Sequence, residues 1–332
     1  MAKKIKDTDY LVISARVRAM ETGLLTRERM EQVLEARSDD EAAKILQECG
    51  YPDLDASRPE SMDAALSAAR EAMLADLGDS APDAGYIDIF KLKYDYHNVK
   101  AVLKARAMGT DASRMLMDMG RVAAAELKDA LETGRLEDLP PMLAAAAAEA
   151  KEVLDTTRDP QLSDIVLDRW YYREMLQTAE DTGSAFLTGY VKVQIDAANL
   201  RALVRVLRMG KSGDFLHNVL FEGGDIPADA VEKAAATAGL AELYGPTRFQ
   251  AAAEAGAEAL KGGPLTEFEK LCDDAVNDYL SGAQFVPFGE APLVGYLAAR
   301  ETEYTNLRIL LMGRAAGLAS DVIRSRLRAG YV

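Results

Sequence analysis

The chain has 332 residues, of which 49% are hydrophobic and 28% charged, and its formal net charge is −15. This length suits two or three domains, and the hydrophobic fraction excludes a disordered chain, which could not bury enough apolar surface to offset its ordering entropy. Because 54 acidic residues face 39 basic ones, the mean field repels phosphate backbones and anionic lipid, so we expect no nucleic-acid partner and no direct bilayer insertion.

The composition and its periodicity predict an all-α fold. Residues that favour helices dominate, and apolar residues recur at helical spacing with little strict alternation. The longest apolar run, "LPPMLAAAAA", has about half the length that a membrane-spanning helix needs. Cys49 and Cys272 lack a disulfide spacing, and the charged opening of the chain lacks the apolar core of a signal peptide. We therefore expect a cytoplasmic protein.

Helix-start signals appear along the chain in order. Thr26 stands at an N-cap position before the amphipathic stretch "RERMEQVL". Ser38 and Glu41 have the spacing of a capping box. Pro140 and Pro141 suit a helix start, where a missing N–H costs little. Each signal predicts a helix beginning directly after it.

A short signature recurs three times, about 100 residues apart. It reads acid-x-x-Asn, then an aliphatic residue, then a cation. Its polar members are Asp95, Asn98 and Lys100; Asp196, Asn199 and Arg201; and Glu303, Asn306 and Arg308. A glycine follows each copy at the same spacing, at Gly109, Gly210 and Gly317, where a helix of that length needs its C-terminal stop.

A second pattern, which we call the landmark, precedes each copy and begins with a glycine. Its members are Gly23, Leu25 and Met30; Gly120, Val122 and Leu127; and Gly224, Ile226 and Val231. The glycine is interpreted as a helix breaker, and the next apolar residue as a staple for the following helix. The repeated order predicts three similar sequential helical domains, at residues 1–112, 113–214 and 215–332.

The acid and the asparagine of each copy lie on one helix face, at the edge of an apolar stripe. One interpretation is three equivalent polar binding sites. The other is structural, because a buried amide must be hydrogen-bonded and can tie backbone groups together. We favour the structural interpretation.

The first two helices that carry the signature are basic although the chain is acidic, and the third is more weakly so. Their cations form a candidate docking face for an acidic partner, and the alternative, a solvated helix face, stays open. Besides the signature cations, this face comprises Lys91, Lys93, Lys104, Arg205 and Arg208.

No catalytic, metal-binding or cofactor-binding constellation is predicted. His97 and His217 fall at different places in their repeats, and neither has an apparent catalytic partner. The stretch "DDAVND", Asp273 to Asp278, half-fits the aspartate-rich helices of a magnesium-dependent prenyl-diphosphate synthase. A second carboxylate cluster is missing, so this enzyme is kept only as an alternative, with solvated helix surface as the other interpretation.

Four stretches together resemble the C subunit of bacterial and archaeal V-type (A-type) ATPases, called the d subunit in eukaryotes. They are "YLVISARVRAMETGLLTRERMEQVLEA", "LKYDYHNVKAVLKAR", "RWYYREML" and "EYTNLRILLMGRAAG". The resemblance covers nearly the whole chain, and the third signature departs from the pattern only by beginning with Glu303.

The resemblance implies three similar domains around a pseudo-threefold axis, forming a funnel. It implies a non-catalytic central-stalk subunit of a rotary motor, without a cofactor, that joins the central shaft to the membrane proteolipid ring. Torque would pass through it for ATP-driven H+ or Na+ transport or for ATP synthesis. One copy, monomeric in isolation, would sit on the cytoplasmic face of the membrane. A helical-repeat scaffold unrelated to a motor is the main alternative, and the prenyl-diphosphate enzyme is the weaker one.

Overall fold

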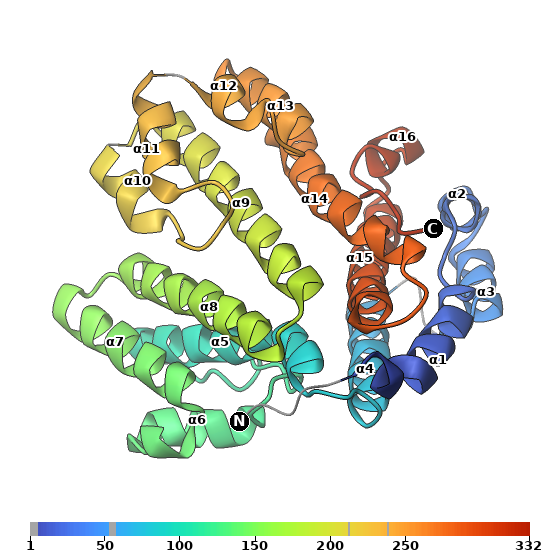
Figure 1. Ribbon diagram of the computed structural model, residues 1–332, viewed down its shortest axis with the longest axis horizontal. Coiled ribbons are helices and arrows are strands. Elements are labelled where there is room, and N and C mark those ends of the chain that lie inside the picture. The colour runs from blue at the N-terminus through green and yellow to red at the C-terminus, as the bar shows by residue number, and fades with distance from the viewer. Residues whose placement is uncertain (1–5, 53–57, 212, 238) are drawn as a thin grey trace. The chain divides into compact units, whose positions relative to one another are not determined.

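The computed structural model describes residues 6–52, 58–211, 213–237 and 239–332. Figure 1 shows this part of the chain as helices and connecting loops, without a strand, and the predicted all-α class is confirmed. The α-helices are α1 Leu11–Glu21, α2 Arg27–Leu34, α3 Asp39–Glu48, α4 Pro59–Gly78, α5 Gly85–Met108, α6 Ala124–Thr133, α7 Pro141–Thr157, α8 Pro160–Thr182, α9 Ala185–Arg208, α10 Gly213–Val219, α11 Ala228–Thr237, α12 Leu240–Tyr244, α13 Gln250–Leu260, α14 Leu265–Ser281, α15 Glu290–Ala315 and α16 Ser320–Arg324. Short 3-10 helices span Asp7–Tyr10, Leu136–Asp138 and Gly282–Phe285.

The chain folds as two compact units. Unit 1 contains Met1–Pro82, Leu203–Gly210 and Lys233–Val332, and unit 2 contains Asp83–Ala202 and Lys211–Glu232. The division into three sequential domains stays a prediction.

Unit 1 is organised around α15, which packs against α1, α2, α4, α14 and α16. Both ends of the sequence therefore contribute to one core. Tyr304, Leu307 and Leu310 of α15 are buried in it, each no more than 1% exposed. Removal of this apolar surface from water is the main term that stabilises the unit.

Unit 2 is organised around α5 and α8, which pack along each other and share α7 as a neighbour, while α6 also packs on α5. α5 is buried on most of its circumference, since Tyr86, Leu92 and Ala105 are no more than 2% exposed and lie on different sides of the helix. A helix that is apolar nearly all round belongs in the interior.

The local helix signals in the sequence are confirmed. Thr26 Oγ1 accepts a hydrogen bond from the Arg29 amide at 3.3 Å, and Ser38 Oγ accepts one from the Glu41 amide at 3.2 Å. α7 begins at Pro141. The three predicted stops, Gly109, Gly210 and Gly317, have φ angles of 66°, 63° and 68°, a left-handed conformation that glycine adopts without a steric penalty.

Candidate functional site: the three buried signature contacts

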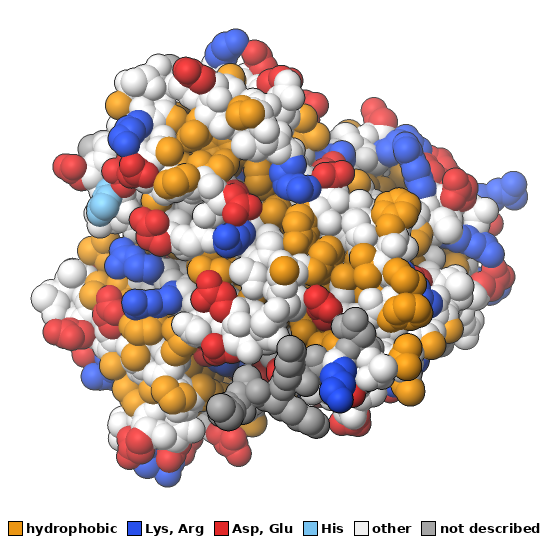
Figure 2. Space-filling view, in the orientation of Figure 1, with side chains coloured by type: hydrophobic (Ala, Val, Ile, Leu, Met, Phe, Trp, Pro, Cys, Tyr) orange, Lys and Arg blue, Asp and Glu red, His pale blue; other side chains and the backbone are white. Residues whose placement is uncertain are grey.

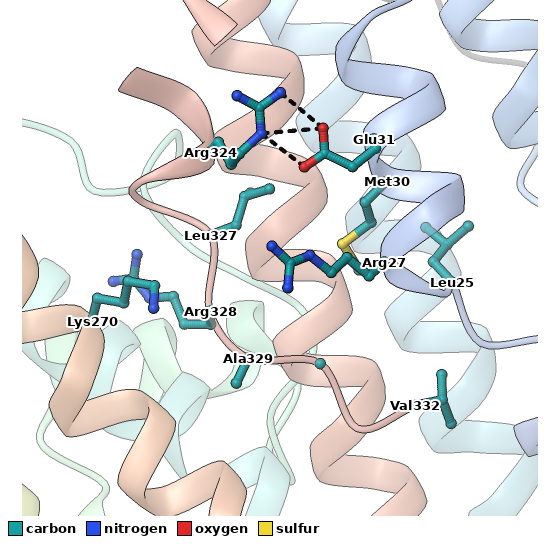
Figure 3. Close-up of a pocket in the computed structure, with 11 residues that line it drawn as sticks. Leu25, Arg27, Met30, Glu31, Lys270, Arg324, Leu327, Arg328, Ala329 and Val332 are labelled. Carbon is teal, nitrogen blue, oxygen red and sulfur yellow. Dashed lines mark hydrogen bonds and ion pairs between the residues drawn. The ribbon is translucent and has the colours of Figure 1, made fainter. Parts of the chain in front are cut away.

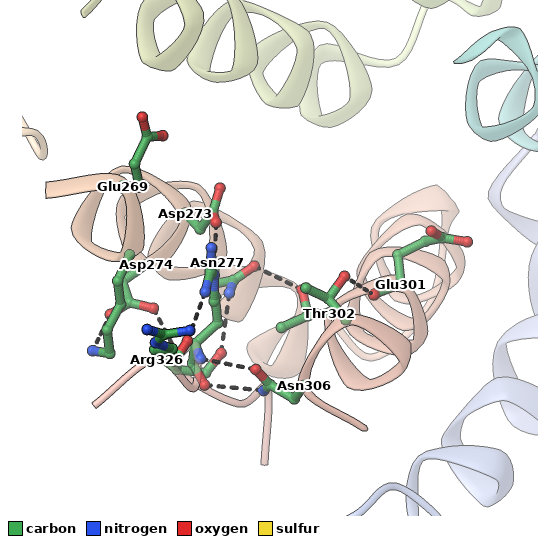
Figure 4. Close-up of polar contacts among 12 residues, drawn as sticks. Glu269, Asp273, Asp274, Asn277, Glu301, Thr302, Asn306 and Arg326 are labelled. Atoms are coloured by element: carbon green, nitrogen blue, oxygen red, sulfur yellow. Dashed lines mark hydrogen bonds and ion pairs between the residues drawn. The ribbon is translucent and has the colours of Figure 1, made fainter. Parts of the chain in front are cut away.

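Each signature asparagine is buried and binds both polar groups of one distant backbone residue. Its amide nitrogen donates to that residue's carbonyl, and its side-chain oxygen accepts from the same residue's N–H. The pairs are Asn98 with Met117 at 2.8 and 2.9 Å, Asn199 with Phe221 at 2.8 and 2.8 Å, and Asn306 with Arg328 at 3.1 and 2.8 Å. Figure 4 shows Asn306 of α15 turned toward the segment that it binds. The amide thus replaces water for backbone groups that burial would leave unpaired.

In the first copy the acid also binds backbone amides. Asp95 is fully buried, and its Oδ1 accepts from the amides of Arg121 and Val122 at 3.0 and 3.3 Å. Arg121 also donates from Nε to Asp95 at 2.7 Å and from Nη1 to Glu174 of α8 at 2.7 Å. Burial raises the pKa of the Asp95 carboxyl, and the guanidinium opposes that rise. We call the contacts of Asp95 and Asn98 with residues 117–122 the first clasp.

The second clasp consists of Asp196 and Asn199 with residues 221–226. Asp196 is 3% exposed and accepts from the amides of Asp225 and Ile226 at 3.2 and 3.0 Å. Among the described residues no cation forms an ion pair with it, since Lys192 pairs with Asp225 instead, at 3.4 Å. Burial raises the pKa of Asp196 to about 6.

The third clasp consists of Glu303 and Asn306 with Leu25 and Arg328. Glu303 accepts from the Leu25 amide at 2.5 Å, and it also binds the Tyr51 hydroxyl and the Arg300 guanidinium. In this copy the acid therefore reaches the N-terminal part of the chain. The first two clasps lie in unit 2 and the third in unit 1.

The three acids all bind the landmark, and always the one that comes next in cyclic order. Asp95 binds the second landmark at Val122, Asp196 the third at Ile226, and Glu303 the first at Leu25. Sequence reasoning found both patterns but missed that they touch. Their equal number and constant order were the available signal.

The landmark glycines have a reason that the helix-breaker interpretation missed. A Cβ at Gly120 would lie 2.1 Å from Asp95 Oδ1, and one at Gly224 would lie 2.1 Å from Asp196 Oδ1. The aspartate can reach the amides only because these positions have no side chain. At Gly23 the nearest atom would be 3.4 Å away, and here the acid is a glutamate, whose extra methylene lets it bind from a greater distance.

Most cations of the predicted docking face bind groups within the chain. Lys100 and Lys104 pair with acids of α8, Arg205 pairs with Glu269 at 2.6 Å, and Arg308 pairs with Asp63 at 3.0 Å. The other contacts are those of Arg208, which donates to the Gly263 carbonyl at 2.9 Å, and Lys93, which lies 4.9 Å from the Tyr94 ring centre. Lys91 and Arg201 are half-buried. These contacts join helices, and the docking role stays a prediction.

The histidines and the acidic stretch form ordinary polar contacts. His97 Nε2 lies 2.9 Å from the Met115 carbonyl, and His217 Nδ1 lies 2.6 Å from Glu232. The acids of "DDAVND" bind cations: Asp273 accepts from Arg328 at 2.8 Å, Asp274 from Lys270 at 2.8 Å, and Asp278 from Arg248 at 2.9 Å. Figure 4 shows Asp273 and Asp274 on α14 within this network. No cluster suited to a metal ion occurs among the described residues.

A pocket of about 360 Å³ lies in unit 1 beside α2 and the C-terminal tail (Figure 3). Four cations line it: Arg27, Lys270, Arg324 and Arg328. Three of them are matched by acids, since Arg324 binds Glu31 at 2.9 Å and the other two bind Asp274 and Asp273. The pocket therefore presents little uncompensated charge to a ligand.

The fold and these contacts define an all-helical protein, and comparison with known proteins identifies its class. Residues 13–326 match the family of ATP synthase (C/AC39) subunits, and the chain belongs to that family. It is similar to the C subunit of the V-type sodium ATPase of Enterococcus hirae, with 27% identity over 330 residues that cover 97% of this chain and 99% of the relative.

Two archaeal relatives support the same family assignment. The C subunit of the A-type ATP synthase of Methanocaldococcus jannaschii is 25% identical, covering 96% of this chain and 86% of the relative. That of Thermococcus kodakarensis is 24% identical, covering 96% and 90%. The resemblance drawn from the sequence is thus confirmed: the chain is a non-catalytic subunit of a V/A-type ATPase complex, and the prenyl-diphosphate and unrelated-scaffold alternatives are wrong. In the described part of the chain, no helix combines the length and the apolar character needed to cross a membrane.

Proposed function

We propose that this chain is the central-stalk subunit that joins the shaft of a rotary V/A-type ATPase to its membrane proteolipid ring. It takes the shaft into a funnel of three similar helical domains, residues 1–112, 113–214 and 215–332. One copy per complex, a monomer when isolated, sits peripherally on the cytoplasmic face. Torque passes through it for H+ or Na+ transport driven by ATP hydrolysis, or for ATP synthesis.

The three clasps are the observation that carries this proposal. A part that transmits torque must resist shear between its helices. Each clasp provides directional hydrogen bonds within a buried site, where water cannot compete for the same groups. Their threefold recurrence supports a joint built from three similar parts, and the family membership supports its place in an ATPase.

Reconstitution tests the proposal directly. The ATPase lacking this chain is combined with the full chain, and coupling is measured as ATP-driven ion uptake by vesicles that contain the complex. We expect ATP hydrolysis without ion uptake when the chain is missing, and uptake restored when it is added. Uptake that is equal with and without the chain would exclude the joint role.

The basic docking face is tested by charge reversal of Lys93, Lys100 and Lys104 to glutamate. We expect weaker binding of the chain to the shaft and ring subunits, because complementary charge is lost. The matched control is the double variant Asp164→Asn and Asp168→Asn, which removes the same internal ion pairs and keeps the lysines. Equal binding by both variants at physiological salt would exclude a docking role for these cations.

A further inference from the structure

We propose that a groove on unit 2, between α8 and the segment of residues 217–223, docks an acidic and partly apolar segment from another subunit of the ATPase. We call it the α8 groove. Its volume is about 600 Å³, and one face of α8 lines it with Arg169, Tyr172, Arg173, Leu176, Gln177 and Glu180. Figure 2 shows Lys and Arg side chains, with Asp and Glu side chains beside them, over the region where α8 faces α10. The inference needs only the family membership and is independent of the torque-transmitting role.

The charges on the two faces of α8 are satisfied differently. On the face toward α5, the acids Asp164 and Asp168 pair with lysines of α5, and the buried Glu174 pairs with Arg121 at 2.7 Å. These interactions hold α8 in place. On this face Asp164, Asp168 and Glu174 thus each have a cation partner within the chain.

On the groove face, Arg169 and Arg173 have no carboxylate partner among the described residues. Arg169 Nη2 donates only to the Asn218 carbonyl at 3.3 Å, and the Arg173 guanidinium lies over the Trp170 ring at 5.2 Å. Both side chains are exposed. Glu180 and Glu222 also line the groove, but neither forms an ion pair with Arg169 or Arg173. The two guanidiniums therefore still favour an occupant that brings a carboxylate to them.

The floor of the groove is apolar and aromatic. The Tyr172 and Phe221 ring centres lie 4.5 Å apart, and Leu176 lies so close to Gly223 that a Cβ there would be 2.5 Å from it. An apolar side chain of the occupant would cover this floor while a neighbouring carboxylate meets the arginines. Aromatic and arginine side chains of this kind dominate the binding energy at protein interfaces.

The second clasp fixes the wall opposite α8. Asn199 binds the N–H and the carbonyl of Phe221, and Asp196 binds the amides of Asp225 and Ile226. The wall therefore loses little conformational entropy when a partner docks. The side chains of Arg169, Arg173, Gln177 and Glu180 are exposed along the groove, an open wall that suits a protein segment better than a small ligand, most of whose surface is usually buried.

Site-specific photo-crosslinking within the assembled ATPase tests the proposal. A benzophenone amino acid replaces Gln177, which lines the groove, or Gln161, an exposed residue on the same helix outside it. From position 177 we expect one dominant crosslink to another ATPase subunit, in a stretch that contains Asp or Glu beside an apolar residue. We expect no such product from position 161. A crosslink to lipid, or no product from position 177 in an assembled complex, overturns the proposal.

Charge reversal at the groove tests the proposal quantitatively, through the affinity of the chain for the rest of the ATPase. The double variant Arg169→Glu and Arg173→Glu is titrated against the ATPase that lacks this chain, and we expect its affinity to fall by at least ~10-fold, with the difference shrinking at high salt. The control Arg106→Glu and Arg114→Glu makes the same change in net charge at exposed residues outside the groove, and we expect less than about a 2-fold loss. Equal losses in the two variants would contradict a specific role for the groove.

Two further outcomes separate the possible failures. If inorganic phosphate or a free dicarboxylate abolishes the position 177 crosslink at millimolar concentration while the complex stays assembled, the groove binds a small anion and the proposal is wrong. If the complex that contains the chain gives the crosslink, but a complex lacking the chain pumps ions equally well, the torque-transmitting role fails and the groove proposal stands. Circular dichroism of each variant excludes loss through unfolding.

Discussion

The first and second clasps share one hydrogen-bond pattern but differ in how the buried charge is balanced. Asp95 has the Arg121 guanidinium at 2.7 Å, and that guanidinium also binds Glu174. Among the described residues Asp196 accepts hydrogen bonds from backbone amides alone, and burial raises its pKa to about 6. The residue after the landmark glycine makes the difference, because it is Arg121 in one copy and Asp225 in the other. A repeated motif therefore conserves geometry within this chain without conserving electrostatics.

The largest expected effect comes from filling the landmark glycine. Gly120→Ala and Gly224→Ala each place a Cβ 2.1 Å from a buried carboxylate oxygen, which forces the acid off its two amides. We expect a loss of about 4 kcal/mol in the free energy of unfolding, measured by urea denaturation. Gly23→Ala is the control, since its Cβ would approach no atom closer than 3.4 Å, and it should cost under about 1 kcal/mol. Equal costs for all three would contradict the steric explanation.

The next largest expected effect comes from neutralising Asp95 or Asp196, and it distinguishes the first clasp from the second. Asp95→Asn leaves the partly buried Arg121 with one carboxylate in place of two, and we expect it to cost about 3 kcal/mol at pH 7.5. Asp196→Asn removes a buried charge that has no counter-ion, so it should cost under about 1 kcal/mol at the same pH. Both are measured by urea denaturation with one fixed m-value. The reverse order would show that the balance of charge is not what distinguishes the clasps.

The pH dependence of the second clasp is the third test. The pKa of an aspartate in an unfolded chain is about 3.9, and burial raises the pKa of Asp196 to about 6. The folded state holds the Asp196 proton more tightly than the unfolded state does. The stabilisation that protonation gives the folded state is therefore fully present below pH ~3.9 and is lost as pH rises through about 6. Between pH 5 and 7.5 the loss is about 1.4 kcal/mol.

Hydrogen exchange can locate that pH effect. After correction for intrinsic rates, the amides of Asp225 and Ile226 should lose protection between pH 5 and 7.5, because Asp196 binds both. The same measurement on Asp196→Asn is the control, and it should show little change over this range. Protection that is constant in the wild-type chain would mean that Asp196 stays ionised throughout.

The smallest expected effect concerns the ion pairs between helices. Lys104→Ala removes the half-exposed pair with Asp164 that joins α5 to α8, and we expect a loss of about 0.5 kcal/mol in the free energy of unfolding, because solvent screens such pairs. The effect should vanish above about 0.5 M salt. A loss as large as that of Asp95→Asn would show that these pairs, and not the clasps, hold the helices together.

Local signals in the sequence predicted the helices and their ends well. Thr26 and Ser38 bind amides three residues away, and Gly109, Gly210 and Gly317 stop their helices. Such features depend on a few neighbouring residues, so a sequence carries them directly.

The sequence predicted which residues form the candidate site, but not which groups they bind. That the acids and the asparagines recur was visible, but their partners lie about 20 to 30 residues away, or across the chain at Leu25.

The charged residues show the same limit. Lys100, Lys104 and Arg205 belong to the candidate docking face, and the sequence did not show that each pairs with an acid on another helix. A count of charges along one helix cannot reveal such partners, because helix packing decides which side chains meet.

By itself, the sequence determined that this protein is all-α, where its helices start and stop, and that one motif occurs three times. The tertiary structure alone decided what the motif does: which amides each acid binds, why two of the three landmark residues must be glycine, and which clasps have a counter-ion. The physical reason is the distance along the chain over which each interaction acts. Helix caps and helix periodicity act over a few residues, whereas burial, ion pairing and the raised pKa of Asp196 depend on what distant segments place around a side chain.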